Sequence, residues 1–174
     1  FQFRLSQRQD LMVMFAEPAT ASALYELHHL PGVVQCEPIR STATRFHFGH
    51  RTRRVGIIGL NPSGRLYRLL DEHERLVSVP RDGLLLSSKL AELLDARLGD
   101  RILVEVLEGE QPIREVPVSG MITEYGGTNA YMDAGAIHRL LREGESLTGA
   151  FLTVERDRMA ELYRTLKDTP RGEY

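Results

Sequence analysis

The two ends of the chain repeat one pattern. Residues 10–32 and 150–172 each carry an apolar run, an acidic exit residue (Glu17 and Glu155), a helical segment and a proline near the end. An apolar run followed by helical periodicity indicates a strand and then a helix. Two such units predict an α+β fold with a ferredoxin-like sandwich of the split β-α-β type. The second unit lacks a convincing last strand, and residues 171–174 are expected to begin it.

Periodicity and turn residues predict the other elements of the first part of the chain. In order, these are a strand at 10–16, a helix at 18–30, strands at 33–40, 42–48 and 53–60, and a short helix at 65–71. Residues 42–48 alternate with a period of two, which places Arg45 and His47 on the face opposite Phe46. Gly49 and His50 form the turn of the resulting hairpin.

The middle of the chain is expected to form a small, mostly β subdomain. Strands are predicted at 101–107 and 113–122, and a helix at 89–97 is capped by Ser87 or Ser88. Gly99 and Asp100 are expected to end that helix, and Asp133 is expected to cap a second helix at 134–142.

Composition excludes several classes of function. The chain has 174 residues and a formal net charge of -2, so its overall charge gives no reason to expect a nucleic-acid partner. It contains one cysteine, Cys36, so neither an internal disulfide nor a cysteine-based metal site can form. No apolar run approaches the roughly 18 residues that a membrane span needs. Because the sequence opens on Phe1 rather than methionine, we expect it to be a piece of a longer protein.

No motif for catalysis or phosphate binding is present. Cys36 with His28 and His29 suggests a thiol nucleophile and a base, but the apolar surroundings favour a packed cysteine. The glycines of residues 56–64 follow a strand, yet they match neither the Walker spacing nor GxGxxG. We therefore expect no catalytic, cofactor-binding or metal-ligating residue.

Two segments are candidates for contact with a partner or substrate. The first is the hairpin end, with His47, Arg51 and Arg53 among further basic residues. The alternative is an ordinary solvated hairpin. The second is the glycine-containing loop, with Tyr125, Gly126, Gly127, Asn129 and Tyr131. There the alternative is that the tyrosines simply pack against the β subdomain.

Three stretches resemble the extracytoplasmic domain of ABC transporter permeases of the FtsX-like, MacB-type family. The first reads GLLLSSKLAELLDARLGDRILVEVLEGEQPIREVPVSGMI from Gly83, the second reads LHHLPGVVQCEP, and the third reads NAYMDAGAIHRLL. The matching residues of the first stretch are Gly83, Leu90, Ala91, Leu94, Gly99, Asp100, Val104, Val116 and Gly120. Those of the second are Leu30, Pro31, Gly32, Val33, Glu37 and Pro38. The likeness covers nearly the whole chain.

The resemblance implies a two-part domain at the periplasmic face of the bacterial inner membrane, tethered by flanking membrane helices. Residues 1–80 with 145–174 would form a porter-like α/β subdomain, and residues 81–144 the inserted β-rich subdomain. ATP would be used by a separate cytoplasmic ATPase subunit, and this chain would need no cofactor. The further partners implied are a second permease copy and a periplasmic adaptor or lipoprotein, but no nucleic acid.

Two other functions stay open at this point. One is a free-standing periplasmic ligand-binding module, with residues 126–132 as its lid. The other is a hydrolase that uses Cys36 or a histidine. The family resemblance favours neither, and it implies instead a non-catalytic domain that transmits ATP-driven motion.

Overall fold

The structure contains two compact units. The computed structural model describes residues 10–124, 127–168 and 172–173. Unit 1 comprises Phe1–Arg40, Ser63–Arg68 and Gly144–Tyr174, and unit 2 comprises Ser41–Pro62 and Leu69–Glu143. This division differs from the one expected at residues 80 and 144, because residues 41–62 and 69–80 pack with the middle of the chain.

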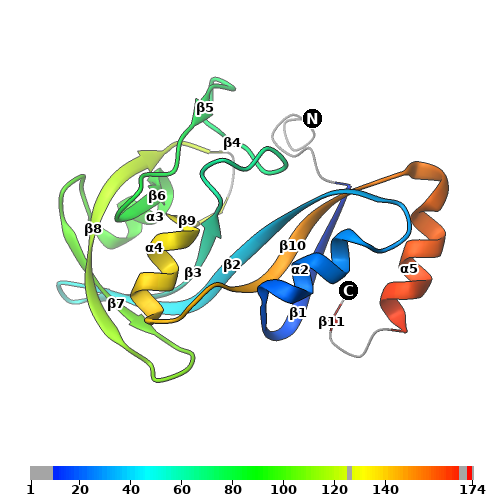
Figure 1. Cartoon of the computed structure of the whole chain (residues 1–174). Helices are drawn as coiled ribbons and strands as arrows, with labels where there is room; N and C mark the ends of the chain where they lie inside the picture. The colour runs from blue at the N-terminus through cyan, green and yellow to red at the C-terminus, as the bar shows by residue number, and fades with distance from the viewer. Residues whose placement is uncertain (1–9, 125–126, 169–171, 174) are drawn as a thin grey trace. The chain divides into compact units, whose positions relative to one another are not determined.

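Unit 1 is an antiparallel sheet with two helices (Figure 1). Its strands follow the order β11-β1-β10-β2. They are β1 (Leu11–Thr20), the first half of β2 (Val33–Phe48), β10 (Ser146–Val154) and β11 (Gly172–Glu173). Helix α2 (Ala21–His28) joins β1 to β2, and a 3-10 turn (Arg156–Arg158) leads from β10 into α5 (Met159–Lys167). The strand expected at 171–174 is present as β11.

Both helices cover the same face of this sheet. Val13 of β1 lies opposite Ala150 of β10, and both side chains are fully buried. Leu27 of α2 packs into the same apolar cluster, as do Leu162 and Leu166 of α5. Burying one such side chain stabilises the fold by roughly 1.5–3 kcal/mol, so this cluster holds the two strand–helix segments together.

The segment Ser63–Arg68 packs within unit 1 in an irregular conformation. The ring of Tyr67 stacks on Phe151 of β10 with a centroid distance of 5.1 Å. The Glu37 carboxylate accepts hydrogen bonds from the backbone N–H groups of Arg65 and Leu66, the second at 3.0 Å. The helix expected at 65–71 is wrong, because these contacts hold the backbone away from helical geometry and residues 69–70 form strand β4.

Unit 2 is built on a closed barrel. Its strands follow the order β2-β3-β9-β6-β8-β7, and β7 also pairs with β2, which closes the ring. Besides the second half of β2, they are β3 (Arg51–Leu60), β6 (Leu84–Ser87), β7 (Arg101–Val106), β8 (Ile113–Ile122) and β9 (Ala130–Asp133). Strands β4 (Leu69–Leu70) and β5 (Leu76–Val77) form a separate two-stranded sheet.

The barrel interior is filled by side chains. Phe46, Ile57, Leu86, Ile102 and Val104 come from four different strands, and each is 0% exposed. Helices α3 (Ser88–Leu94) and α4 (Ala134–Leu141) add further residues to the same cluster. The expected strands at 101–107 and 113–122 are confirmed as β7 and β8.

The barrel consists of two halves with the same pairing pattern. In one half, β6 leads into α3 and pairs in parallel with β8 of the β7–β8 hairpin. In the other, β9 leads into α4 and pairs in parallel with β3 of the β2–β3 hairpin. The halves meet through the antiparallel pairs β6–β9 and β2–β7. The topology therefore has an internal twofold repeat.

The two helices begin and end alike. The Ser87 hydroxyl accepts the N–H of Leu90 at 3.3 Å, and the Asp133 carboxylate accepts the N–H of Gly135 at 2.8 Å. Both expected N-caps are thus confirmed, with Ser87 as the first. The helix end expected at Gly99–Asp100 is wrong, because α3 ends at Leu94 and Asp95 takes the left-handed cap conformation with φ 56°.

Gly83 and Gly99 provide a matched test of this packing. Both have positive φ, at 85° and 89°. A Cβ at Gly83 would meet the Ser119 hydroxyl and would lie 2.7 Å from the Pro117 carbonyl oxygen, whereas one at Gly99 meets nothing within 4 Å. We expect Gly99→Ala to cost about 1 kcal/mol from its backbone conformation. Gly83→Ala should cost a further ~1–3 kcal/mol from overpacking. Thermal and urea unfolding of both variants measures the difference, and equal costs would contradict the close approach of β8 at Gly83.

Candidate functional site: the outer face of the β2–β3 hairpin

The β2–β3 hairpin places its charged residues on the outside of the barrel. Thr44 and Phe46 are fully buried, while Arg45 and His47 alternate with them and stay partly exposed. The Thr44 hydroxyl donates to the Val55 carbonyl at 2.6 Å, which fixes the hairpin from inside. The face assignment made from the alternating sequence is confirmed.

A polar cluster joins three strands on this outer face. The Glu105 carboxylate of β7 lies 3.2 Å from an Arg45 guanidinium nitrogen and 3.0 Å from His47 Nε2. The other ring nitrogen of His47, Nδ1, lies 3.1 Å from the Thr52 hydroxyl of β3. His47 is therefore held between β3 and β7, rather than free at a solvated hairpin end.

Glu105 is the electrostatic centre of this cluster. The hydrogen bond from His47 lowers the pKa of the Glu105 carboxyl below its ordinary value. Partial desolvation opposes this shift, and the hydrogen bond and charge of Arg45 add to it. Glu105 therefore stays ionised at neutral pH.

Arg51 and Arg53 lie nearer the hairpin turn. An Arg51 guanidinium nitrogen donates to the Leu93 carbonyl at 3.1 Å, in the last turn of α3. Arg53 is half-buried. This hydrogen bond holds the Arg51 side chain against α3 within unit 2.

The second predicted segment is mostly part of the barrel wall. Tyr125 and Gly126 lie outside the described residues. Asn129 Nδ2 and the Tyr131 hydroxyl both donate to the Glu124 carboxylate, at 3.0 Å in each case, and Gly127 has φ 86°. Tyr131 is 1% exposed within β9. A lid over 126–132 is wrong for residues 130–132, because they pair with β3 and β6.

Cys36 is a packed side chain of unit 1. It lies against the apolar cluster under α2 and α5. Burial, with a smaller contribution from the Glu37 charge, raises the pKa of the Cys36 thiol to about 12. A thiol that stays protonated at neutral pH is a poor nucleophile. His29 instead lies against Tyr25, with Nδ1 2.8 Å from the Tyr25 carbonyl oxygen. Within the described part of the chain, no group of three or more histidine, cysteine or acidic residues is placed to hold a metal ion.

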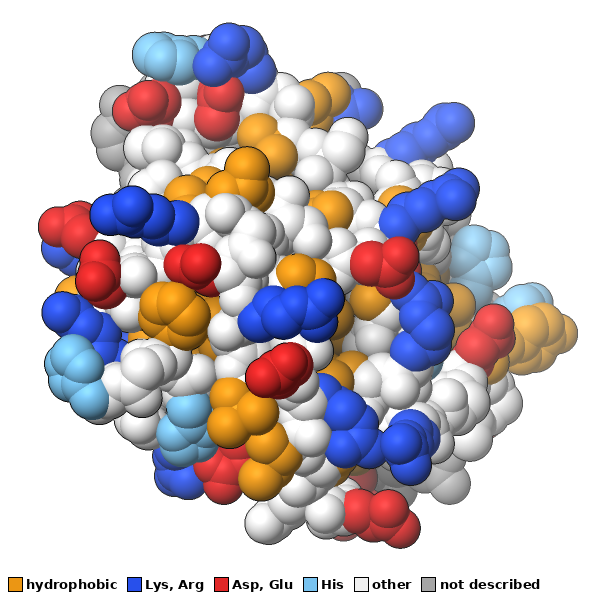
Figure 2. Space-filling model, turned by 90° about the vertical axis from the view of Figure 1, so that its left-hand side faces the viewer, with side chains coloured by type: hydrophobic (Ala, Val, Ile, Leu, Met, Phe, Trp, Pro, Cys, Tyr) orange, Lys and Arg blue, Asp and Glu red, His pale blue; other side chains and the backbone are white. Residues whose placement is uncertain are grey.

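Two apolar residues that were not predicted as site residues lie beside the polar cluster. Leu103 of β7 and Ile113 of β8 are 39% and 51% exposed. Strand register places Leu103 opposite His47 and Ile113 opposite Glu105. Figure 2 views the side that carries β7 and β8, and hydrophobic side chains lie there among arginine and acidic ones. Alternation in residues 101–105 would have revealed Leu103 as an outward-facing leucine.

Comparison with known proteins identifies the fold. No protein-family model and no curated protein matches the sequence. The crystal structure of the extracellular domain of YknZ, a noncanonic ABC-type transporter from Gram-positive bacteria, is similar with a TM-score of 0.57 and 15% identity. The match covers 91% of this chain and 94% of that one. The chain shares the fold of these transporter domains.

The periplasmic region of MacB from Actinobacillus actinomycetemcomitans is also similar. Its TM-score is 0.52 at 15% identity, with 90% of this chain and 82% of that chain covered. The resemblance to MacB-type extracytoplasmic domains is therefore confirmed as a likeness of fold. No helix in the described part of this MacB-like chain is long and apolar enough to cross a membrane.

Replacing Glu105 by glutamine tests the cluster. We expect Glu105→Gln to lower the unfolding temperature at neutral pH, because Arg45 and His47 lose a charged acceptor. Since the folded-state pKa of Glu105 is lowered, the wild-type advantage is present above the ordinary glutamate pKa and disappears as pH falls through the lowered value. Unfolding temperatures of the wild type and of Glu105→Gln, measured from neutral pH to about pH 3, show whether the difference between them disappears. Glu115→Gln, a neighbouring change on β8, is the control, and a pH-independent Glu105 effect would contradict the assignment.

Proposed function

We propose that this chain is the extracytoplasmic domain of an ABC transporter permease. In this proposal it is non-catalytic and transmits ATP-driven motion to an exported substrate or a periplasmic partner. The observation that carries it is the likeness of fold to the YknZ and MacB domains over nine-tenths of the chain. Unit 1 corresponds to the porter-like part with a split β-α-β arrangement, and unit 2 to the inserted β-rich part.

In the proposed transporter, other chains carry out ATP hydrolysis and complete the assembly. A cytoplasmic ATPase subunit uses ATP, a second permease copy completes the transporter, and an adaptor or lipoprotein meets the domain on the periplasmic side. The filled interior of unit 2 and the protonated thiol of Cys36 support a contact domain rather than an enzyme. The candidate contact residues are His47, Arg51 and Arg53 on the hairpin, and Gly127 and Asn129 in the second segment.

Cysteine labelling tests the location. The complete gene product would carry Cys36→Ala and Leu98→Cys, because Leu98 is 67% exposed. In intact spheroplasts we expect a membrane-impermeant maleimide to label Leu98→Cys without detergent, since the domain lies outside the membrane. Labelling only after lysis would place the domain in the cytoplasm and overturn the proposal. Release of the labelled protein into the medium would favour the free-standing binding module.

Distance measurements test the transmission of motion. Spin labels at Leu98→Cys in unit 2 and Tyr163→Cys in unit 1 use two exposed positions, again with Cys36→Ala. In the purified transporter with its ATPase, we expect the distance distribution between the labels to change when ATP and vanadate are added. A label pair within unit 2, Leu98→Cys and Ile113→Cys, should not change. Identical distributions for the first pair would contradict a moving domain.

A further inference from the structure

The charge of this chain is unevenly distributed along the sequence. Residues 38–70 contain seven arginines and no aspartate or glutamate, although the whole chain has 24 acidic and 22 basic residues. Four of these arginines, Arg45, Arg51, Arg53 and Arg54, lie on the β2–β3 hairpin. Alternation places Arg45 and Arg54 on the outer face of the hairpin, whereas Arg51 and Arg53 lie on its other face. The outer face therefore carries two arginines on a chain whose net charge is negative.

The hairpin register places two like charges side by side. The two-residue turn at Gly49 and His50 sets Arg45 of β2 directly opposite Arg54 of β3. The contact between His47 and Thr52 fits this register. Like charges directly opposite each other on a sheet are destabilising. The repulsion between Arg45 and Arg54 therefore destabilises the hairpin, and an anion bound between the two guanidinium groups would remove this repulsion.

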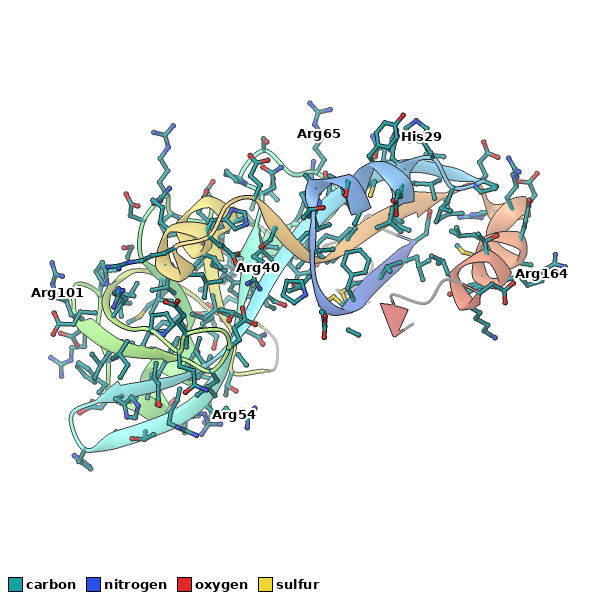
Figure 3. All side chains as sticks on the ribbon, turned by 60° about the horizontal axis from the view of Figure 1, so that its bottom comes forward. His29, Arg40, Arg54, Arg65, Arg101 and Arg164 are labelled. Carbon is teal, nitrogen blue, oxygen red and sulfur yellow. The ribbon has the colours of Figure 1, made fainter. Side chains whose placement is uncertain are left out.

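Within the chain, only part of this charge is balanced. Glu105 flanks Arg45 on the side away from β3 and also accepts from His47. No described side chain forms an ion pair with Arg54, which is exposed on the hairpin (Figure 3). Across the four strands the row reads Arg54, Arg45, Glu105 and Ile113. The positive charge is thus concentrated at the β3 end, and an apolar side chain lies at the β8 end.

We propose that this face docks an acidic segment of a protein partner, with one partner carboxylate seated between Arg45 and Arg54. Guanidinium groups suit this role because their planar donors bind carboxylates in a bidentate manner. The exposed Leu103 and Ile113 lie beside the charged row and offer apolar contact to neighbouring partner residues. The inference rests on the proposed function, because it names the chemistry of the periplasmic partner.

The same face fits an anionic membrane surface less well. A membrane presents a continuous sheet of negative charge, and charges within about 8 Å act together at physiological salt. Such a surface would meet Glu105 and Glu115 as well as the arginines, because all point outward from adjacent strands. A protein segment can place one carboxylate at Arg54 and apolar or basic groups elsewhere. The mixed row therefore favours a protein.

A peptide titration of the 174-residue chain tests this inference. The probe is a capped ten-residue peptide of alternating glutamate and serine, and its matched control has glutamine in place of glutamate. We expect the glutamate peptide alone to shift the backbone amide resonances of residues 45, 52–54 and 103–105, and to bind more weakly at high salt. Shifts confined to other residues, or equal shifts with the glutamine peptide, would overturn the proposal.

Variants of Arg54 separate docking from folding. We expect Arg54→Gln to weaken peptide binding by roughly tenfold, since it removes one charged partner. Arg164→Gln, the same change on exposed α5, should leave binding unaltered. Arg54→Glu supplies a carboxylate to Arg45 from within the chain, so it should abolish binding and raise the unfolding temperature. Equal weakening by Arg54→Gln and Arg164→Gln would indicate non-specific charge and would overturn the proposal.

Vesicles distinguish the two anionic surfaces. Vesicles containing phosphatidylglycerol should not bind the chain through Arg54. If the wild-type chain binds these vesicles but not the peptide, and Arg54→Gln removes the vesicle binding, the face binds a membrane. That result would overturn the proposal of a protein partner.

The peptide and vesicle measurements use only this domain, so a negative result in them leaves the proposed permease function intact. If the maleimide fails to label the complete protein in intact spheroplasts, the permease proposal is overturned, but the proposed binding of a carboxylate by Arg45 and Arg54 is not.

Discussion

The register of β2 is the constraint on which the rest of the structure depends. This strand pairs with β10 through its first half and with β7 through its second half. It therefore contributes to the sheet of unit 1 and to the barrel of unit 2. The β2–β7 pairing closes the barrel and removes the open edges that β2 and β7 would otherwise present. A slip of one residue would turn Phe46 outward and Arg45 into a dry interior. Burying an unpaired charge there is far more costly than any pairing gained.

The outer face of the hairpin is a consequence of the same register. When Thr44 and Phe46 enter the barrel, Arg45 and His47 must point outward and meet Glu105 across the β2–β7 pair. Glu105 therefore neutralises one arginine, holds His47, and leaves Arg54 as the unbalanced charge. The polar cluster stabilises closure of the barrel, and the remaining charge is available to a partner. The proposed docking therefore uses side chains that lie beside those that hold the barrel closed.

Local signals predicted most elements, whereas long-range pairing had to come from the structure. The alternation around Phe46, the caps at Ser87 and Asp133 and the repeat of β1–α2 in β10–α5 depend on neighbours in sequence, and these predictions agree with the structure. Residues 65–71 were predicted as a helix because the local sequence does not reveal that the distant Glu37 accepts hydrogen bonds from the N–H groups of Arg65 and Leu66. Tyr131 was taken for a loop residue because its pairing with Leu85 and Ile58 is distant. Of the candidate site, the outward-facing basic residues were predictable, but Glu105, which lies 58 residues from His47, was not.

The internal repeat of the barrel explains why its interior is filled by side chains. Each half contributes a helix whose apolar face fills the interior, through Leu90 and Leu94 of α3 and through Ile137 and Leu140 of α4. A barrel filled from both halves offers its interior to packing rather than to a ligand, which disfavours a binding module built around that space. Its hairpins, by contrast, carry side chains whose identity packing does not dictate. The two hairpins occupy equivalent positions, yet residues 41–60 of the β2–β3 hairpin contain no aspartate or glutamate, whereas the β7–β8 hairpin carries Glu105 and Glu115 among its acidic residues. Because the fold places the two hairpins alike, it does not require this difference in charge, and the proposed docking of an acidic segment would account for it.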